Sequence, residues 1–156
     1  HIGYINVDVI GVGSSGYDSL KAIPAYADIT NPINVSHKSN YVAMSKTDPP
    51  RPLFTMRNLR AEMYWRFREA LDPEHGDDIA LPPGNEIIAD LCAARYKLMA
   101  NGVIEIEPKD AIKQRIGRSP DVGEAIMMAW LQQEQGATWD NIKSLGSVGR
   151  FTHRWG

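Results

Sequence analysis

Two acidic side chains in unusual settings are the first candidates for chemistry in this chain. Asp8 lies inside an apolar, strand-like segment, with Val7 and Val9 beside it. Burying a lone carboxylate costs free energy, so Asp8 needs a charged partner, a metal ion or a place at the rim of a sheet. Functional groups of α/β proteins gather at the carboxyl ends of strands, and Asp8 stands just before a glycine-rich turn. An arginine partner, or a cap on that turn, would explain Asp8 without a catalytic role.

Asp121 is the second candidate and belongs to the tripeptide Ser119-Pro120-Asp121. Glu124 follows one helical turn later, so both carboxylates would project from one face of a helix toward a single ion. The alternative without a metal is that acids in the first turn of a helix interact favourably with the helix dipole.

Acids from separate segments, without a cluster of histidines or cysteines, suit hard cations such as Mg²⁺ or Mn²⁺ rather than zinc. Such carboxylates are the ligands of two-metal phosphodiester cleavage, in which ions about 4 Å apart activate a water and stabilise the leaving oxygen. Asp8, Asp121 and Glu124 are therefore the predicted metal-binding residues, and Asp8 and Asp121 are the predicted catalytic carboxylates.

A competing motif lies between the predicted first strand and the predicted first helix. Residues 11–16 read Gly-Val-Gly-Ser-Ser-Gly, a literal GxGxxG, and Asp28 lies downstream where an acid could meet a ribose hydroxyl. An acid inside the strand has no role in a dinucleotide site, and a second parallel strand with its own crossover is hard to find after residue 36. A tight strand-to-helix turn alone would also explain the glycines.

Basic residues gather just before Asp121 and could contact DNA phosphates. They are Lys109, Lys113, Arg115 and Arg118. A second basic group occupies the predicted long helix and consists of Arg57, Arg60, Arg66 and Arg68. Acids are interleaved with both groups, so a solvated helix face with internal ion pairs is the simpler explanation for any one residue. The group next to Asp121 is the predicted DNA-binding surface.

Periodic patterns predict the elements that position these candidates. A buried strand is predicted over residues 2–12, followed by a helix over 17–23 that Pro24 closes, and a short strand over 33–35. Residues 36–52 hold three prolines and lack periodicity, which predicts a mobile loop. Apolar residues three or four apart predict an amphipathic helix over 56–71.

In the second half of the chain, helices alternate with a hairpin. Short helices are predicted over residues 86–93 and 109–115, and an Asn-Gly turn predicts a hairpin over 96–106. Ser119 and Pro120 have the form of an N-cap and first helical residue for a last helix that runs to about residue 133.

Length and composition indicate one globular domain. The chain has 156 residues, of which 43% are hydrophobic and 23% are charged. No apolar run approaches the roughly 20 residues that cross a bilayer, so no membrane partner is expected. The net charge of -2 requires any DNA-binding surface to be local, and the single cysteine excludes an internal disulfide, as in a reducing compartment.

Four segments occur in the order seen in the large subunits of phage DNA-packaging terminases. They are 7–13 (VDVIGVG) with 17–20 (YDSL), 58–62 (NLRAE) with 65–66 (WR), 79–82 (IALP), and 117–121 (GRSPD). Each segment alone is weak, but the four in order are a specific match over residues 5–131. The chain resembles the C-terminal nuclease domain of that family.

The resemblance implies an α/β fold similar to ribonuclease H, with a mixed sheet flanked by helices. It also implies an endonuclease that binds two Mg²⁺ or Mn²⁺ ions and cuts concatemeric double-stranded DNA at the start and end of packaging. On this comparison Asp8 matches the family's second acid and Asp121 the third. Many relatives have a further Asp where this chain has Glu124, which keeps the charge but lengthens the reach.

The chain also departs from the family pattern. The family's first acid lies on a strand ahead of the one that matches Asp8. The resemblance therefore implies an N-terminally truncated nuclease domain over residues 1–134, with an incomplete metal site and weak or no activity, and a tail over residues 135–156. The phosphate-binding loop of the family's ATPase motor domain has no counterpart in the sequence, so the chain alone could not translocate DNA.

The resemblance implies partners as well. They are double-stranded DNA, the terminase ATPase domain, the portal protein and the small terminase subunit, in the cytoplasm of a bacterial host that carries the phage or prophage. A non-catalytic module that clamps DNA, or docks on the motor or portal, is the alternative function.

Overall fold

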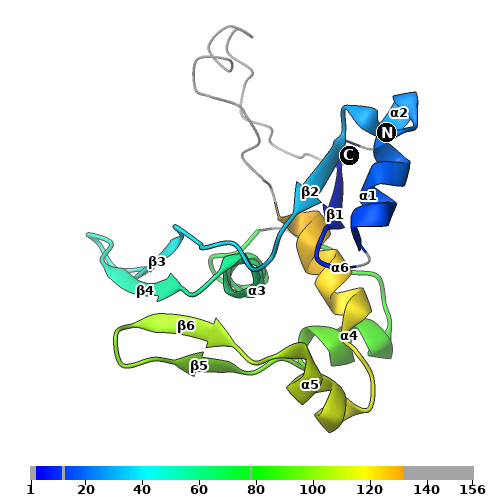
Figure 1. Cartoon of the computed structure of the whole chain (residues 1–156). Helices are drawn as coiled ribbons and strands as arrows, with labels where there is room; N and C mark the ends of the chain where they lie inside the picture. Colours follow the sequence, from blue (N-terminus) through cyan, green and yellow to red (C-terminus); the bar gives the residue numbers. More distant parts are fainter. Residues whose placement is uncertain (1–2, 12, 78, 132–156) are drawn as a thin grey trace, which may run out of the picture.

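The computed structural model describes residues 3–11, 13–77 and 79–131. In chain order the elements are β1 (Ile5–Asp8), α1 (Gly13–Lys21), α2 (Pro24–Ala27), β2 (Thr30–Ile33), β3 (Val42–Met44), β4 (Pro52–Met56), α3 (Leu59–Ala70), α4 (Asn85–Leu91), β5 (Tyr96–Leu98), β6 (Val103–Ile106), α5 (Lys109–Ile116) and α6 (Asp121–Trp130) (Figure 1). The predicted tail over 135–156 lies outside the described residues. None of the described helices is long and apolar enough to cross a membrane.

The chain begins with a parallel crossover unit of β1, α1 and β2. β1 pairs with β2 in parallel, with Ile5 opposite Thr30, and α1 packs against both strands. The predicted first strand and helix are confirmed, although the helix begins at Gly13 and Pro24 starts α2 instead of closing α1. β2 lies slightly earlier than predicted. Its Asn31 and Pro32 are both depleted in strands and conceal it in the sequence.

A second, four-stranded sheet has the order β3-β4-β6-β5 and mixes parallel and antiparallel pairs. The central strands β4 and β6 are parallel, whereas each outer strand is antiparallel to its neighbour. The predicted hairpin over 96–106 is confirmed, and Gly102 serves its turn with φ of 75°.

The predicted loop over residues 36–52 is wrong in part, because Val42–Met44 form β3. A strand of three residues is too short to give a periodic signal in the sequence. Pairing with β4 and the burial of Ala43, which is 1% exposed, form it instead.

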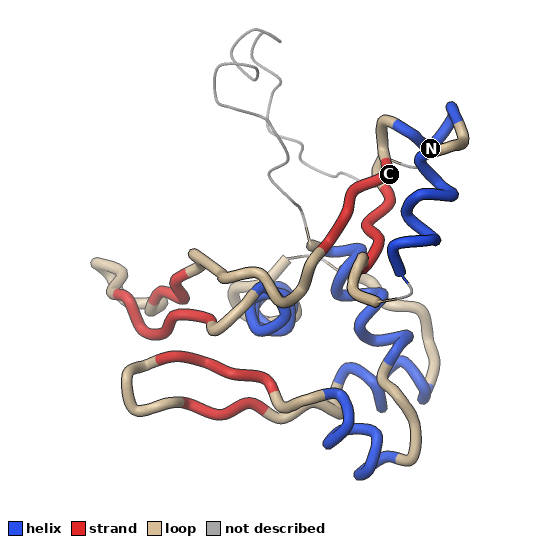
Figure 2. The backbone as a smooth tube through the Cα atoms, viewed as in Figure 1, coloured by secondary structure: helices blue, strands red, loops and turns tan. Residues whose placement is uncertain are grey.

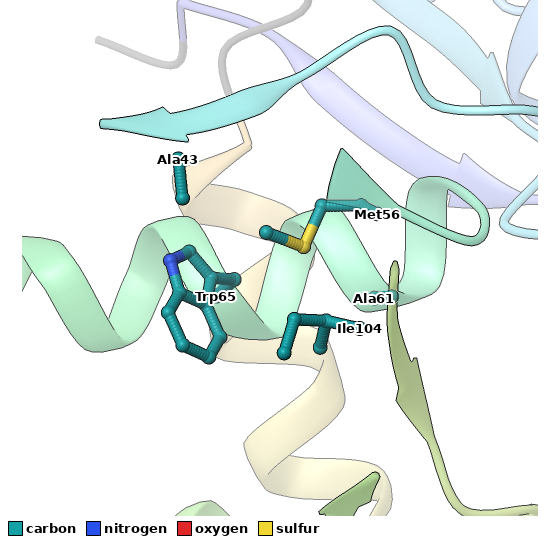
Figure 3. Close-up of a cluster of buried hydrophobic side chains, with 5 residues drawn as sticks. All are labelled: Ala43, Met56, Ala61, Trp65 and Ile104. Carbon is teal, nitrogen blue, oxygen red and sulfur yellow. The ribbon is translucent and has the colours of Figure 1, made fainter. Parts of the chain in front are cut away.

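α3 packs on the four-stranded sheet and forms the main core with it. The Asn58 side chain caps the helix by accepting a hydrogen bond from the N–H of Ala61 at 3.0 Å. The helix therefore begins later than predicted, and Met56, where the predicted helix began, ends β4 instead. Figure 3 shows the buried cluster that α3 shares with the sheet, which consists of Ala43, Met56, Ala61, Trp65 and Ile104.

α6 joins the two parts of the molecule. Figure 2 shows the β1–β2 pair and the four-stranded sheet as separate groups of strands, with α3 and α6 between them. Met127 of α6 is 2% exposed and packs in a second buried cluster with Met63, Tyr64 and Phe67 of α3. On the β1 side, Asn6 Nδ2 donates to the carbonyls of Met128 at 2.8 Å and Leu131 at 3.0 Å. The helix that begins with Asp121 is thus bound to the strand that ends with Asp8.

Candidate functional site

Asp8 is the last residue of β1, where the chain turns sharply into α1. Its Oδ1 accepts a hydrogen bond from the backbone N–H of Ile10 at 3.0 Å. The predicted turn cap is therefore observed, and no arginine pairs with Asp8 among the described residues. The hydrogen bond occupies one carboxylate oxygen, and Oδ2 has no partner among the described residues.

The glycine motif after Asp8 serves this turn. Gly11 has a positive φ of 66°, and a Cβ added to Gly13 would come within 1.8 Å of the Asp8 carbonyl oxygen. Gly16, in contrast, has open space around its Cβ position. A dinucleotide fingerprint needs its third glycine for close packing of helix on strand, and Gly16 has no such neighbour. The motif therefore fits a tight turn better than a dinucleotide site, although β2 does supply a parallel strand for the crossover.

Asp121 is the first residue of α6, and its side chain is 72% exposed. The Ser119 hydroxyl donates to Asp121 Oδ1 at 2.7 Å, and Lys109 Nζ lies 3.4 Å from the same oxygen. The hydrogen bond from Ser119 is the largest effect on the pKa of Asp121, and with the help of the Lys109 charge it holds that pKa below its usual value against the opposing effect of burial. Asp121 is thus an ionised, accessible carboxylate, and its Oδ2 has no partner in the described part of the chain.

Glu124 has a different environment, because its side chain is only 10% exposed and both of its oxygens are engaged. Oε1 accepts hydrogen bonds from Arg60 Nη2 at 2.8 Å and from the Tyr64 hydroxyl at 2.9 Å. Oε2 lies 2.6 Å from Lys109 Nζ. These four residues are called the Glu124 network below. It ties α6 to α3 and α5.

The Glu124 network also changes the protonation of its members. Burial, followed by the charge of Glu124, raises the pKa of the Tyr64 phenol. Burial of Lys109 acts to lower its pKa, but the hydrogen bond and charge of Glu124 outweigh that effect and raise it. Lys109 therefore stays charged and lies between the carboxylates of Asp121 and Glu124.

The structure brings two of the three predicted ligands together. Asp121 and Glu124 share Lys109, as their helical spacing predicts. β1 meets α6 near the C-terminal end of the helix, where Asn6 Nδ2 donates to the carbonyls of Met128 and Leu131, whereas Asp121 is the first residue of α6. No group of three acidic, histidine or cysteine side chains within the described ranges forms a ready cation site. The ligand set predicted from the sequence is therefore not preassembled.

The predicted DNA-binding residues differ in how far they are already engaged. Lys109 pairs with Glu124, Arg115 pairs with Glu107 at 2.5 Å, and Arg118 pairs with Asp90 at 2.5 Å. Lys113 is exposed and has no ion pair in the described part of the chain. Its charge acts on Asp121, whose pKa it helps to lower. Lys113 is thus the member of this group that is free to meet a phosphate.

Asp90 of α4 is a polar residue of this region that the sequence pattern did not reveal. It is fully buried, and its Oδ2 accepts hydrogen bonds from the backbone N–H groups of Val122 at 3.1 Å and Gly123 at 3.2 Å. The predicted N-cap of α6 is wrong, because the Ser119 hydroxyl donates to Asp121 and no side chain at Pro120 caps the helix. The one available signal was an acid within the otherwise apolar stretch Ile87-Ile88-Ala89-Asp90-Leu91.

The fold, with its mixed sheet, flanking helices and parallel crossover unit, resembles that of solved terminase nuclease domains. It is similar to the nuclease domain of the large terminase subunit gp2 of bacterial virus Sf6, with a TM-score of 0.60 and 23% identity over 83% of this chain and 65% of that chain. A mutant of that domain with manganese and beta-thujaplicinol gives a TM-score of 0.60 at 22% identity, and a mutant with calcium gives 0.58 at 22%. In both of these comparisons the match again covers 83% of this chain and 65% of the other.

These likenesses confirm the predicted α/β, ribonuclease H-like fold, and with it the predicted resemblance at the level of fold. The chain spans about 65% of the length of the solved domains. The sequence itself matches no family model and no curated protein.

Proposed function

We propose that the chain is a metal-dependent endonuclease domain of a phage or prophage DNA-packaging terminase. The observation that carries the proposal is the fold, which it shares with the Sf6 terminase nuclease domain. Asp8 and Asp121 support it, because each lies at the end of an element and keeps one carboxylate oxygen without a partner among the described residues. The proposed substrate is concatemeric double-stranded DNA in the cytoplasm of the bacterial host.

The donor chemistry fits Mg²⁺ or Mn²⁺. Carboxylate oxygens are the ligands that these hard cations prefer, and the similar Sf6 structures hold manganese or calcium. When bound, a pair of such ions would supply an activated water and neutralise the leaving oxygen. Asp8 and Asp121 are the proposed first ligands. Glu124 is proposed as a ligand only through Oε2, the oxygen that Lys109 now contacts.

Lys113 is the proposed phosphate contact of this domain. It is exposed on α5, close enough for its charge to act on Asp121, and no acid pairs with it in the described residues. Lys109, Arg115 and Arg118 each have an acidic partner, so their binding to DNA would require exchange of that partner.

A second candidate function is a non-catalytic module that clamps DNA or docks on the terminase ATPase domain, the portal or the small terminase subunit. The observation that favours it is that the described side chains do not form a group of three metal ligands. The module would use the same fold and the same basic residues but would cut nothing.

Cleavage of linear double-stranded DNA by this chain in Mn²⁺ separates the two functions. Nuclease function predicts cutting that chelation stops and that Asp8→Ala or Asp121→Ala reduces at least a hundredfold, which corresponds to about 2.7 kcal/mol of transition-state stabilisation. Asp18→Ala is the matched control, since Asp18 is an exposed acid on α1. DNA binding with neither Mn²⁺ binding nor metal-dependent cutting would support the clamping module and reject the nuclease.

A further inference from the structure

The first turn of α6 is held by a residue from a different helix. The leading amides of a helix have no partner within the helix, and a side chain just before the helix usually satisfies them. In α6 that role falls to Asp90, whose Oδ2 accepts from the amides of Val122 and Gly123. These two residues directly follow Asp121 in the chain.

The contact between α4 and α6 leaves no room for adjustment. A Cβ on Gly123 would lie 2.7 Å from Asp90 Cβ and 3.1 Å from the backbone nitrogen of Leu91. Glycine at position 123 therefore lets α6 approach α4 closely enough for the two hydrogen bonds to form. The same close contact therefore fixes both the distance between α4 and α6 and the place at which Asp90 caps α6.

The other oxygen of Asp90 depends on Arg118. Oδ1 is buried and lies 2.5 Å from Arg118 Nη1, in a contact without hydrogen-bond geometry, and it accepts no hydrogen bond from the described residues. Arg118 also reaches Glu86, with Nη1 3.6 Å from its Oε1. The guanidinium is therefore the group that compensates the charge of a fully buried carboxylate.

This arrangement sets the direction in which α6 presents its first residue. Successive helical residues are rotated by about 100°, so a start displaced by one residue would turn Asp121 away from its present direction. Asp90 holds the two amides that fix where the helix starts. Among the described residues, only Ser119 and Lys109 make further contacts that orient the exposed Asp121 side chain.

We propose that Asp90 is a positioning residue that aims Asp121 at the metal, and that Arg118 acts through Asp90 rather than on the DNA. The inference rests on the proposed nuclease function. It adds a residue that touches neither substrate nor ion, and it gives Arg118 a role different from the one its charge suggests.

Three variants of the full chain test the proposal. Asp90→Ala removes both the cap on α6 and the ion pair with Arg118. Asp90→Asn keeps an oxygen that can accept from the two amides but loses the negative charge. Arg118→Gln leaves Asp90 in place and removes only the positive charge beside it. Glu69→Gln is the control, because Glu69 accepts hydrogen bonds from Tyr41 and Trp65 and makes no contact with α6 among those described. Each variant is measured for the hydrogen-exchange rates of the Val122 and Gly123 amides, the Kd for Mn²⁺, kcat and KM for DNA. All measurements are made at a temperature below the onset of unfolding.

The positioning role predicts at least a tenfold faster exchange of both amides in Asp90→Ala, with a Kd for Mn²⁺ raised at least tenfold. Asp90→Asn and Arg118→Gln should show smaller changes of the same kind, with kcat lowered and KM for DNA within twofold of the wild type. Glu69→Gln should change none of these quantities by more than twofold.

Provided that the wild type binds Mn²⁺ and cuts DNA, two results would overturn the proposal. One is faster amide exchange with unchanged Mn²⁺ affinity and kcat, which would make Asp90 purely structural. The other is an Arg118→Gln effect confined to KM and its salt dependence, which would make Arg118 a DNA contact. A wild type that neither binds Mn²⁺ nor cuts DNA would reject the nuclease function itself, and the positioning role with it.

Discussion

Two carboxylate networks meet on α3, and they differ in the charge of their donors. Glu124 accepts from the cations Arg60 and Lys109 as well as from the Tyr64 hydroxyl. Glu69 accepts from neutral groups, the Tyr41 hydroxyl at 2.5 Å and the Trp65 indole N–H at 2.9 Å.

The two networks also join different parts of the molecule. The Glu124 network ties the helix of Asp121 to the core, whereas the Glu69 network ties α3 to the segment that leads into β3. The proposed metal site involves the first network, because Lys109 joins Glu124 to Asp121, whereas the Glu69 carboxylate has no such link to a proposed ligand among the described residues.

The largest expected effect is on the charged network. Glu124→Ala leaves Arg60, whose side chain is 13% exposed, as a charge without its partner. Breaking a buried pair in this way costs about 3–5 kcal/mol, so the free energy of unfolding should fall by that amount in urea denaturation. A loss below about 1 kcal/mol would mean that the network contributes little to holding α6.

Glu69→Ala should have a smaller effect, because it removes two hydrogen bonds from neutral donors. The expected loss is about 1–3 kcal/mol of unfolding free energy. Mn²⁺ affinity, measured by calorimetry on the folded variant, should stay within twofold of the wild type. An affinity loss equal to that of Asp121→Ala would remove the distinction between the two networks.

The neutral network should also respond to alkaline pH. Burial, followed by the hydrogen bond and charge of Glu69, raises the pKa of Tyr41 to about 12 from an ordinary value of 10.0. Because the folded state favours the protonated phenol, its contribution to stability is complete below pH 10 and is lost as the pH rises toward 12. Urea denaturation between pH 9 and 12 should give a shallower decline for Tyr41→Phe than for the wild type. Identical slopes would contradict this origin of the stability.

The smallest effect on stability is expected for Lys113→Ala, which removes an exposed side chain without an acidic partner among the described residues. The free energy of unfolding should change by less than about 0.5 kcal/mol. KM for DNA should rise, and the slope of log affinity against log salt should fall by about 1. Lys97→Ala, an exposed lysine on β5, is the control. Equal effects of both variants would mean that DNA binding has no preferred surface.

Local patterns in the sequence predicted the elements whose signals are local. The apolar spacing of α3, the Asn-Gly turn of the β5–β6 hairpin and the apolar run of β1 all appear where expected. Asp8 at the end of its strand and Asp121 at the start of its helix follow from the same patterns.

The features that the sequence could not reveal depend on partners far along the chain. β3 forms a strand because it pairs with β4, and β2 is concealed by Pro32. Asp90 caps amides 32 and 33 residues away, so no short motif contains it. In the same way, the burial of Glu124 against Arg60 of another helix gives it an environment unlike that of the exposed Asp121, although both share one helical face.

The central claim is that Asp8 and Asp121 bind a common metal ion. The direct test is a crystal of this chain soaked in Mn²⁺, with the anomalous difference map calculated at the manganese edge. The account predicts a peak coordinated by carboxylate oxygens of both residues, with the Lys109 ammonium displaced from Glu124 Oε2 if Glu124 joins the ion. A peak that contacts neither aspartate, or no peak in a crystal where both carboxylates are ordered and accessible, would contradict it.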